Sequence, residues 1–150
     1  AGSYREGVLG DDQLDSYEFT LTEATLSSGQ SLKITLAWDD VPAVPGAVRT
    51  LVNDLDVFVI DPNGVKHHPW TLDPDHPASP AQRTGPDRVN TLEMVQIDGP
   101  AVGTWQVFVR GTTVPDGPQP YSIVVTGTTL FPRVLEGGGA PRSRDTKRLP

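Results

Sequence analysis

Large apolar and polar residues alternate with a period of two along most of this 150-residue chain, and no helical periodicity recurs. In Tyr17–Thr22 the large apolar residues hold the odd positions, and in Leu32–Trp38 they hold the even positions. Such alternation places one face of a β-strand on a core and the other in solvent. Six segments are expected to be strands, and two shorter strands are expected beside them. The six are Tyr17–Thr22, Leu32–Trp38, Asp54–Asp61, Leu92–Asp98, Trp105–Val109 and Tyr121–Val125, and the shorter two lie near Val48–Val52 and Gly64–Thr71.

Residues suited to tight turns separate these segments. In Asp61–Gly64 a proline fixes one φ angle and a glycine leaves another free, so this sequence predicts a hairpin turn. Ser27–Gln30, Gly99–Gly103 and Pro115–Pro118 have similar turn chemistry. About eight short antiparallel strands predict an all-β fold, an antiparallel two-sheet β-sandwich or jelly roll.

Two stretches interrupt the alternation. Leu72–Arg88 contains four prolines among polar residues, which predicts a long loop of the kind that is often functional or held by a metal ion. Beyond Thr129 a run of three glycines and a basic end predict a linker or a disordered tail. We therefore expect a jelly-roll domain over residues 1–129 and a flexible, Gly-rich, basic tail over residues 130–150.

Composition adds exclusions to this picture. The 15 glycines and 15 prolines favour strands and turns over helices. No run approaches the roughly 20 apolar residues of a membrane-spanning helix, and the absence of cysteine excludes disulfides and thiolate metal sites. A net charge of −7 argues against nucleic acid as a partner and favours hard cations. The first ten residues lack the apolar stretch of a signal peptide, so we interpret the chain as a piece of a longer protein.

The densest chemical signal is the sequence Asn53–Asp56, which reads Asn-Asp-Leu-Asp. Alternate residues of a strand share a face, so Asp54 and Asp56 are expected to project together. Adjacent carboxylates repel and are costly to bury unpaired, and Ca²⁺, which takes six to eight oxygen ligands, removes both penalties. The alternative is a solvated strand end, with Asp40 and Asp87 capping turns. Further oxygen donors are Asp39, Asp40, Asp87, Asn90 and Glu93.

Other candidate clusters are weaker. Asp73 and Asp75 form a second group of oxygen donors, which turn-forming aspartates explain equally well. His67 and His68 would point to opposite faces of a strand, and no Cys or HExxH pattern accompanies them. Together with His76 they are interpreted as surface histidines.

No constellation predicts catalysis by this chain. It has neither a GxSxG elbow nor a serine in a Gly-Thr-Ser-Met-Ala setting. Asp54 and Asp56 would lie about 7 Å apart along one strand, which does not place them across a sugar. Trp38 and Trp105 fall in phase with the core, leaving Trp70 as the candidate for stacking on a carbohydrate. We expect no catalytic residue and assign no substrate-binding residue.

Five segments occur in the order found in one known family. They resemble the C-terminal domains of bacterial subtilisin-like (subtilase, S8-type) serine proteases over roughly residues 14–126. The segments are Leu32–Pro42 (LKITLAWDDVP), Leu51–Val57 (LVNDLDV) with the Pro-Asn-Gly turn after it, Val89–Val95 (VNTLEMV), Gly103–Val107 (GTWQV) and Val114–Val125 (VPDGPQPYSIVV).

The resemblance implies a non-catalytic β-jelly roll appended to a Ser-His-Asp protease, with calcium bound in the jelly roll. It implies as partner the N-terminal subtilisin-like catalytic domain of the same polypeptide, in a secreted, extracellular, monomeric bacterial protein. Thr91 stands where the family has a second Asn, which removes one side-chain carbonyl, and residues 69–88 depart from the family pattern. Carried over by position, the residues near calcium are Asp39, Asn53, Asp54, Asp56, Asn90 and Glu93.

The leading prediction is therefore a calcium-binding accessory domain of a serine endopeptidase, which stabilises the catalytic domain and helps to present substrates. One alternative is a free-standing β-sandwich module that binds carbohydrate or a cell surface. Another is a structural domain of an adhesin-like protein. A catalytic triad upstream of Ala1 in the parent protein would distinguish the first from the other two.

Overall fold

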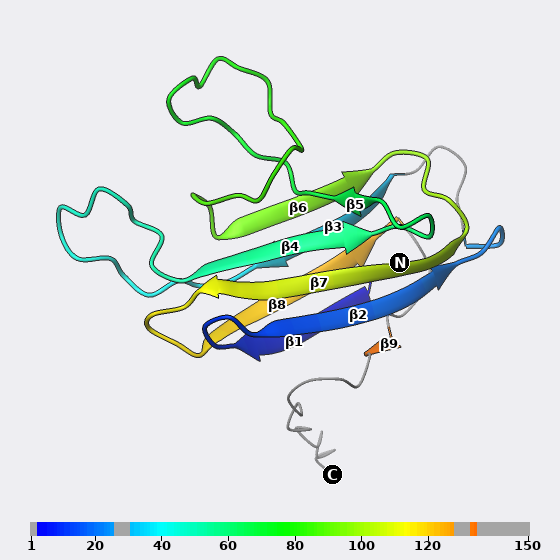
Figure 1. Ribbon diagram of the computed structural model, residues 1–150, viewed down its shortest axis with the longest axis horizontal. Helices are drawn as coiled ribbons and strands as arrows, with labels where there is room; N and C mark the ends of the chain where they lie inside the picture. The colour runs from blue at the N-terminus through cyan, green and yellow to red at the C-terminus, as the bar shows by residue number, and fades with distance from the viewer. Residues whose placement is uncertain (1–2, 26–30, 128–132, 135–150) are drawn as a thin grey trace, which may run out of the picture.

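Two antiparallel β-sheets form the protein in the computed structural model, which describes residues 3–25, 31–127 and 133–134 (Figure 1). The described residues contain no helix, and hence none long and apolar enough to cross a membrane. In chain order the strands are β1 (Ser3–Leu9), β2 (Leu14–Leu21), β3 (Leu32–Ala37), β4 (Asp54–Ile60), β5 (Lys66–His67), β6 (Leu92–Ile97), β7 (Gly103–Thr113), β8 (Gln119–Thr126) and β9 (Arg133–Val134).

The strand order is that of a long hairpin rolled into two layers. One sheet has the order β1-β8-β3-β6 and the other β5-β4-β7-β2-β9. The antiparallel pairs β1·β8, β2·β7, β3·β6 and β4·β5 join the first strand to the eighth, the second to the seventh, and so on inward. This nested pairing is a jelly roll. The predicted antiparallel two-sheet β-sandwich is therefore confirmed.

The core lies between the sheets and follows the alternation of the sequence. On β3 the residues Leu32, Ile34 and Leu36 are fully buried, while the residues between them are exposed or half-buried. Trp38 and Trp105 are buried in the same core, as their phase predicts. Trp70 is half-buried, and the guanidinium of Arg83 lies 4.2 Å from its ring centroid. One face of the Trp70 ring is thus covered by Arg83.

One expected strand is absent and another was not expected. Val48–Val52 forms a loop rather than a strand, and β1 supplies the eighth strand. β1 has weak alternation because Gly7 stands where a side chain would point inward, and a Cβ there would overlap the ring of Tyr121. The second short strand is present as β5, within the expected Gly64–Thr71.

The predicted tail lies mostly outside the described residues. Arg133–Val134 forms β9 and pairs with Tyr17 and Glu18 of β2. Residues 128–132 and 135–150 are not described, so the boundary at residue 129 stays a prediction.

The open edges of the two sheets meet along one side of the sandwich. β6 is the last strand of its sheet, and β4 lies next to the two-residue β5 at the end of the other sheet. Residues of β4 and β6 are in contact across this edge. The long segment between β5 and β6 leaves the sandwich there, as the predicted loop (Figure 1). The candidate site lies where β4 and β6 both begin.

Candidate functional site

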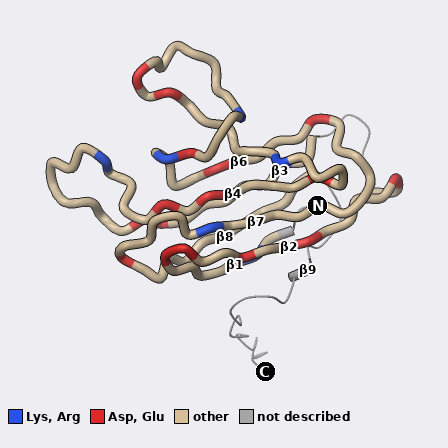
Figure 2. Tube along the Cα trace, in the orientation of Figure 1, with Lys and Arg blue, Asp and Glu red and all other residues tan. Residues whose placement is uncertain are grey.

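The acidic start of β4 lies beside two arginines from neighbouring segments. Arg88 Nη1 lies 3.1 Å from Asp54 Oδ2, and 2.8 and 2.7 Å from Oδ1 and Oδ2 of Asp56. Arg49 Nη2 lies 2.8 Å from Asp54 Oδ2, and the hydroxyl of Thr112 donates to Asp56. Figure 2 shows this gathering, with basic positions (blue) on the loop before β4 and on the segment before β6, near the acidic start of β4 (red). The two aspartates share a face of the strand, as predicted, and two guanidinium groups neutralise them.

Glu93 joins this cluster from the other sheet. It lies on β6 and is 1% exposed. Its Oε2 accepts a hydrogen bond of 2.8 Å from the backbone N–H of Val57 on β4. β5 pairs with Val59 and Ile60, beyond this point, so a side chain rather than a strand satisfies that N–H. Glu93 therefore ties the two sheets together at their common edge.

Burial dominates the electrostatics of the cluster. It raises the pKa of the Glu93 carboxyl to about 9, and repulsion by neighbouring aspartates, foremost Asp56, adds to the rise. Burial also raises the pKa of Asp54, against the opposing charge of Arg88. At neutral pH the Glu93 carboxyl is therefore protonated when no further cation is present.

Two buried oxygens of the cluster have no hydrogen-bond partner among the described residues, namely Asp54 Oδ1 and Glu93 Oε1. Buried polar atoms are rarely left unpaired, because the loss of a partner costs about 1–3 kcal/mol. The donors are all oxygens, which suit Ca²⁺. Yet in the ranges that the structure describes, no three His, Cys, Asp or Glu side chains are arranged to hold a metal ion. Arg88 fills the side that Asp54 and Asp56 share.

Asp40 and Asp87 both cap turns. Asp40 accepts hydrogen bonds from the backbone N–H groups of Val41, Val52 and Asn53. Asp87 accepts from the N–H groups of Val89 and Asn90 and from the side-chain amide of Asn90. These contacts are those expected of turn-capping aspartates. Asp87 nevertheless lies close enough to raise the pKa of Glu93.

The structure separates two of the predicted calcium residues from the cluster. Asn53 is fully buried, and its amide bonds to the backbone of Asp116 and to Gln119 Oε1. Asp39 is exposed, and its backbone carbonyl accepts a hydrogen bond from Gln119 Nε2. Both residues therefore brace the loop between β7 and β8. Of the six predicted residues, the structure gathers Asp54, Asp56 and Glu93, with Asn90 held against Asp87 nearby.

The three histidines do not converge. His67 Nε2 lies 3.3 Å from Asp61 Oδ2, and His76 Nδ1 lies 2.8 Å from Asp73 Oδ2. His68 is half-buried, and burial lowers its pKa. Asp73 also accepts the backbone N–H of Asp75, which is the turn chemistry expected there.

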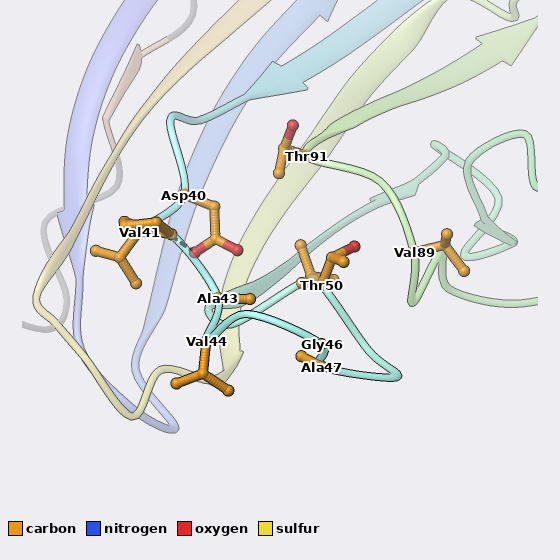
Figure 3. Close-up of a pocket in the computed structure, with 11 residues that line it drawn as sticks. Asp40, Val41, Ala43, Val44, Gly46, Ala47, Thr50, Val89 and Thr91 are labelled. Atoms are coloured by element: carbon orange, nitrogen blue, oxygen red, sulfur yellow. Dashed lines mark hydrogen bonds between the residues drawn. The ribbon is translucent and has the colours of Figure 1, made fainter.

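A hollow of about 350 Å³ opens between the segment 40–51 and the segment that leads into β6 (Figure 3). Its one charged lining residue, Asp40, is engaged by backbone N–H groups. The rest of the lining is small or apolar, so the hollow has no reactive group. The lining residues are Asp40, Val41, Pro42, Ala43, Val44, Gly46, Ala47, Thr50, Leu51, Val89 and Thr91.

Sequence reasoning missed the cations of the cluster. Arg49 and Arg88 stand in loops, where a charged residue is normally solvated. Their positions in the sequence could have pointed to the cluster. Each arginine lies about five residues before a predicted acidic ligand, Arg49 before Asp54 and Arg88 before Glu93.

Comparison with known proteins links the chain to proteins named as serine proteases. No protein-family profile matches it. It is 26% identical over 127 residues, 83% of the chain, to the serine protease/ABC transporter B family protein tagA of Dictyostelium discoideum. It is also 30% identical over 98 residues, 62% of the chain, to the serine protease/ABC transporter B family protein tagB of the same organism. The matched stretches make up 7% and 5% of those relatives, so the chain corresponds to a small part of each.

Proposed function

We propose that this chain is a non-catalytic accessory domain of a secreted, subtilisin-like serine endopeptidase, and that it binds calcium. The observation that carries the proposal is the similarity of 83% of the chain to 7% of a far longer protein whose name includes serine protease. The described residues form a two-sheet β-sandwich, and the sequence has no serine in an activating motif. The partner is the catalytic domain of the same polypeptide.

The accessory domain acts by binding the folded form of the catalytic domain. A tether gives the module a high effective concentration at its partner, and interfaces between domains of one chain commonly bury roughly 600–1,500 Å². Such an interface slows unfolding of the catalytic domain without contacting its active site. It also places the module beside the substrate, where it helps presentation.

Deleting residues 1–127 from the parent endopeptidase tests this role. We expect a several-fold shorter half-life on heating and a nearly unchanged initial rate on a small chromogenic peptide. Deletion of residues 135–150 alone serves as the matched control. Loss of activity on the small peptide by a catalytic domain that stays folded contradicts the proposal. An unchanged half-life together with lost binding to insoluble polysaccharide favours the carbohydrate-binding alternative.

Calcium belongs to the proposal through the carboxylates of Asp54, Asp56 and Glu93. Two of their buried oxygens lack a hydrogen-bond partner among the described residues, and all three side chains offer the oxygen donors that calcium prefers. Bound there, calcium would supply positive charge to buried carboxylates from both sheets. Asp54 and Asp56 would hold it from β4, and Glu93 would hold it from β6.

Thermal unfolding in calcium or in chelator tests this part. Extracellular calcium sites commonly have a Kd of roughly 10⁻⁴–10⁻³ M. A free calcium concentration ten times the Kd stabilises the folded state by about 1.4 kcal/mol. We expect this increment in the unmodified chain and in the control Asp75→Ala, and its loss in Asp54→Ala. Identical melting of the unmodified chain in millimolar calcium and in chelator contradicts a calcium site.

A further inference from the structure

A second hollow, of about 370 Å³, lies between β5 and β6 at the edge where the two sheets meet. Its lining is rich in basic and imidazole side chains: Lys66 and His67 belong to β5, His68 follows β5, and Arg83 comes from the long loop. Ligand pockets commonly have volumes of roughly 300–1,000 Å³. The hollow is therefore large enough for one or two side chains of a partner.

The cations of this hollow have few carboxylate partners. Arg88, by contrast, contacts Asp56 at 2.7 Å. Lys66 forms no ion pair with any residue that the structure describes, and Arg83 Nη1 lies 3.9 Å from the nearest carboxylate oxygen, Asp98 Oδ2. Arg83 Nη1 donates instead to the Gln96 backbone carbonyl, at 2.7 Å. A guanidinium has five N–H donors and an ammonium three, so most of these donors remain available.

His68 adds a titratable group to the same hollow. It is half-buried, and its ring forms no hydrogen bond with a described residue. Burial lowers the pKa of His68, and the charge of Lys66 lowers it further, while Asp56 acts in the opposite direction. A negative charge placed beside the imidazole favours its protonated form. An anion in the hollow would therefore raise the pKa of His68.

The field inside the hollow is positive although the chain has a net charge of −7. Lys66 and Arg83 line it, and Lys33 lies close enough to lower the pKa of Asp98. These three cations outnumber the two nearby carboxylates, Asp98 and Asp61. Asp61 is further engaged by backbone N–H groups of its own turn. Because charges more than about 8 Å away are largely screened at physiological ionic strength, the local cations dominate.

These donors fit the carboxylate of a peptide better than they fit a sugar. A planar guanidinium matches a carboxylate, and an ammonium adds a flexible donor. The described lining contains no Trp, Tyr or Phe face on which a sugar ring would stack. Asp98, with 61% of its side chain exposed, can accept an N–H from a peptide backbone. Acidic peptides offer both the carboxylate and the N–H groups.

We propose that the hollow between β5 and β6 binds an acidic peptide segment, with a Glu or Asp carboxylate held by Arg83 and Lys66 beside His68. The inference deepens the proposed function and rests on it for the origin of the peptide, which would be part of a protein substrate that the accessory domain presents. An accessory domain with this site favours substrates that have acidic segments.

Nuclear magnetic resonance titration of the isotope-labelled chain tests the site with a blocked triglutamate peptide as probe. We expect the largest shifts in residues 66–68 and 96–98, and no binding of the matched triglutamine peptide. Arg83→Gln should weaken binding about tenfold, as the loss of one charge-assisted hydrogen bond commonly does, and the exposed Lys66→Gln should weaken it several-fold. Arg110→Gln is the control, because Arg110 is an equally exposed arginine that pairs with Asp12 elsewhere on the domain.

The imidazole signals of His68 give a readout in the unmodified chain, independent of how any variant folds. We expect saturating triglutamate, but not triglutamine, to raise the pKa of His68. A pKa that does not change when triglutamate has bound overturns the placement of the carboxylate in this hollow.

The remaining outcomes each decide one part of the proposal. Equal binding of triglutamine overturns recognition by charge, and triglutamate binding that survives both Arg83→Gln and Lys66→Gln overturns the site. Trigalacturonate that binds as tightly as triglutamate, or more tightly, overturns the choice of a peptide and favours an acidic polysaccharide. No binding of either acid overturns the inference alone, since the accessory role is tested separately by the half-life of the parent endopeptidase without residues 1–127.

Discussion

Substitution of Glu93 by Gln changes how the stability of the domain depends on pH. The Glu93 carboxyl has an ordinary pKa of 4.5, which burial raises to about 9 in the folded chain. Between these values the unfolded chain has lost the proton and the folded chain retains it. Stability is therefore fully present below pH 4.5 and declines as the pH rises towards 9. The slope is about 1.4 kcal/mol per pH unit, or about 4 kcal/mol from pH 5 to pH 8 as an upper bound.

Glutamine removes this term while preserving the contacts. Its side-chain oxygen can accept the Val57 N–H that Glu93 now accepts, and the side chain is neutral at every pH. In chelator, Glu93→Gln should be more stable than the unmodified chain at pH 8 and should show a flatter pH profile. The exposed Glu23→Gln serves as control and should follow the unmodified chain.

Urea denaturation at unit steps from pH 5 to pH 8, in chelator, gives the free energies of unfolding directly. Burial lowers the pKa of His68 below its ordinary value of 6.5, so this residue contributes the opposite trend below pH 6.5, equally in all three proteins. The reasoning fails if the unmodified chain and Glu93→Gln have parallel profiles. It also fails if Glu93→Gln is the less stable protein at pH 8, because Glu93 would then be ionised and favourable in the fold.

Three further predictions concern the rest of the domain. Burial and the hydrogen bond with Tyr17 raise the pKa of the Tyr121 phenol and keep it protonated. The free energy of unfolding, measured from pH 9 to pH 11, should therefore fall above pH 10, and it should fall less steeply in Tyr121→Phe. Gly7→Ala forces a Cβ into the Tyr121 ring and should cost about 1–3 kcal/mol in urea denaturation, whereas Gly85→Ala, with open space around it, should be near neutral. The isolated chain should not hydrolyse a chromogenic peptide, and turnover that survives repurification and is lost on a single substitution in this chain would show otherwise.

The alternation of the sequence predicts those strands that bury one complete face. β3 and the part of β7 from Trp105 to Val109 belong to this class, because their inward residues are large and apolar without interruption. The alternation does not predict β1, because β1 is an edge strand with a glycine at an inward position. Val48–Val52 reads as a strand by composition but is a loop. The carboxylate of Asp40 binds the backbone N–H of Val52 there, in place of a neighbouring strand.

The sequence predicts only that part of the candidate site whose residues lie close together in the chain. Asp54 and Asp56 share a strand face, so the sequence spacing is enough to bring them together. Asn53 precedes Asp54 by one residue and uses its amide in another loop, which a list of oxygen donors does not reveal. Glu93 reaches the cluster because β4 and β6 meet across two sheets, and the family resemblance, not periodicity, placed it there. Arg88 lies at the end of a long loop, and no sequence pattern predicts the path of that loop.

A crystal of the chain grown with calcium tests the account of the β4–β6 edge most directly. The anomalous signal of calcium locates the ion independently of the shape of the electron density. We expect one peak in contact with the carboxylates of Asp54 and Glu93. A crystal grown with calcium that shows no peak at this edge, and in which Arg88 bridges Asp54 and Asp56, would contradict the calcium site.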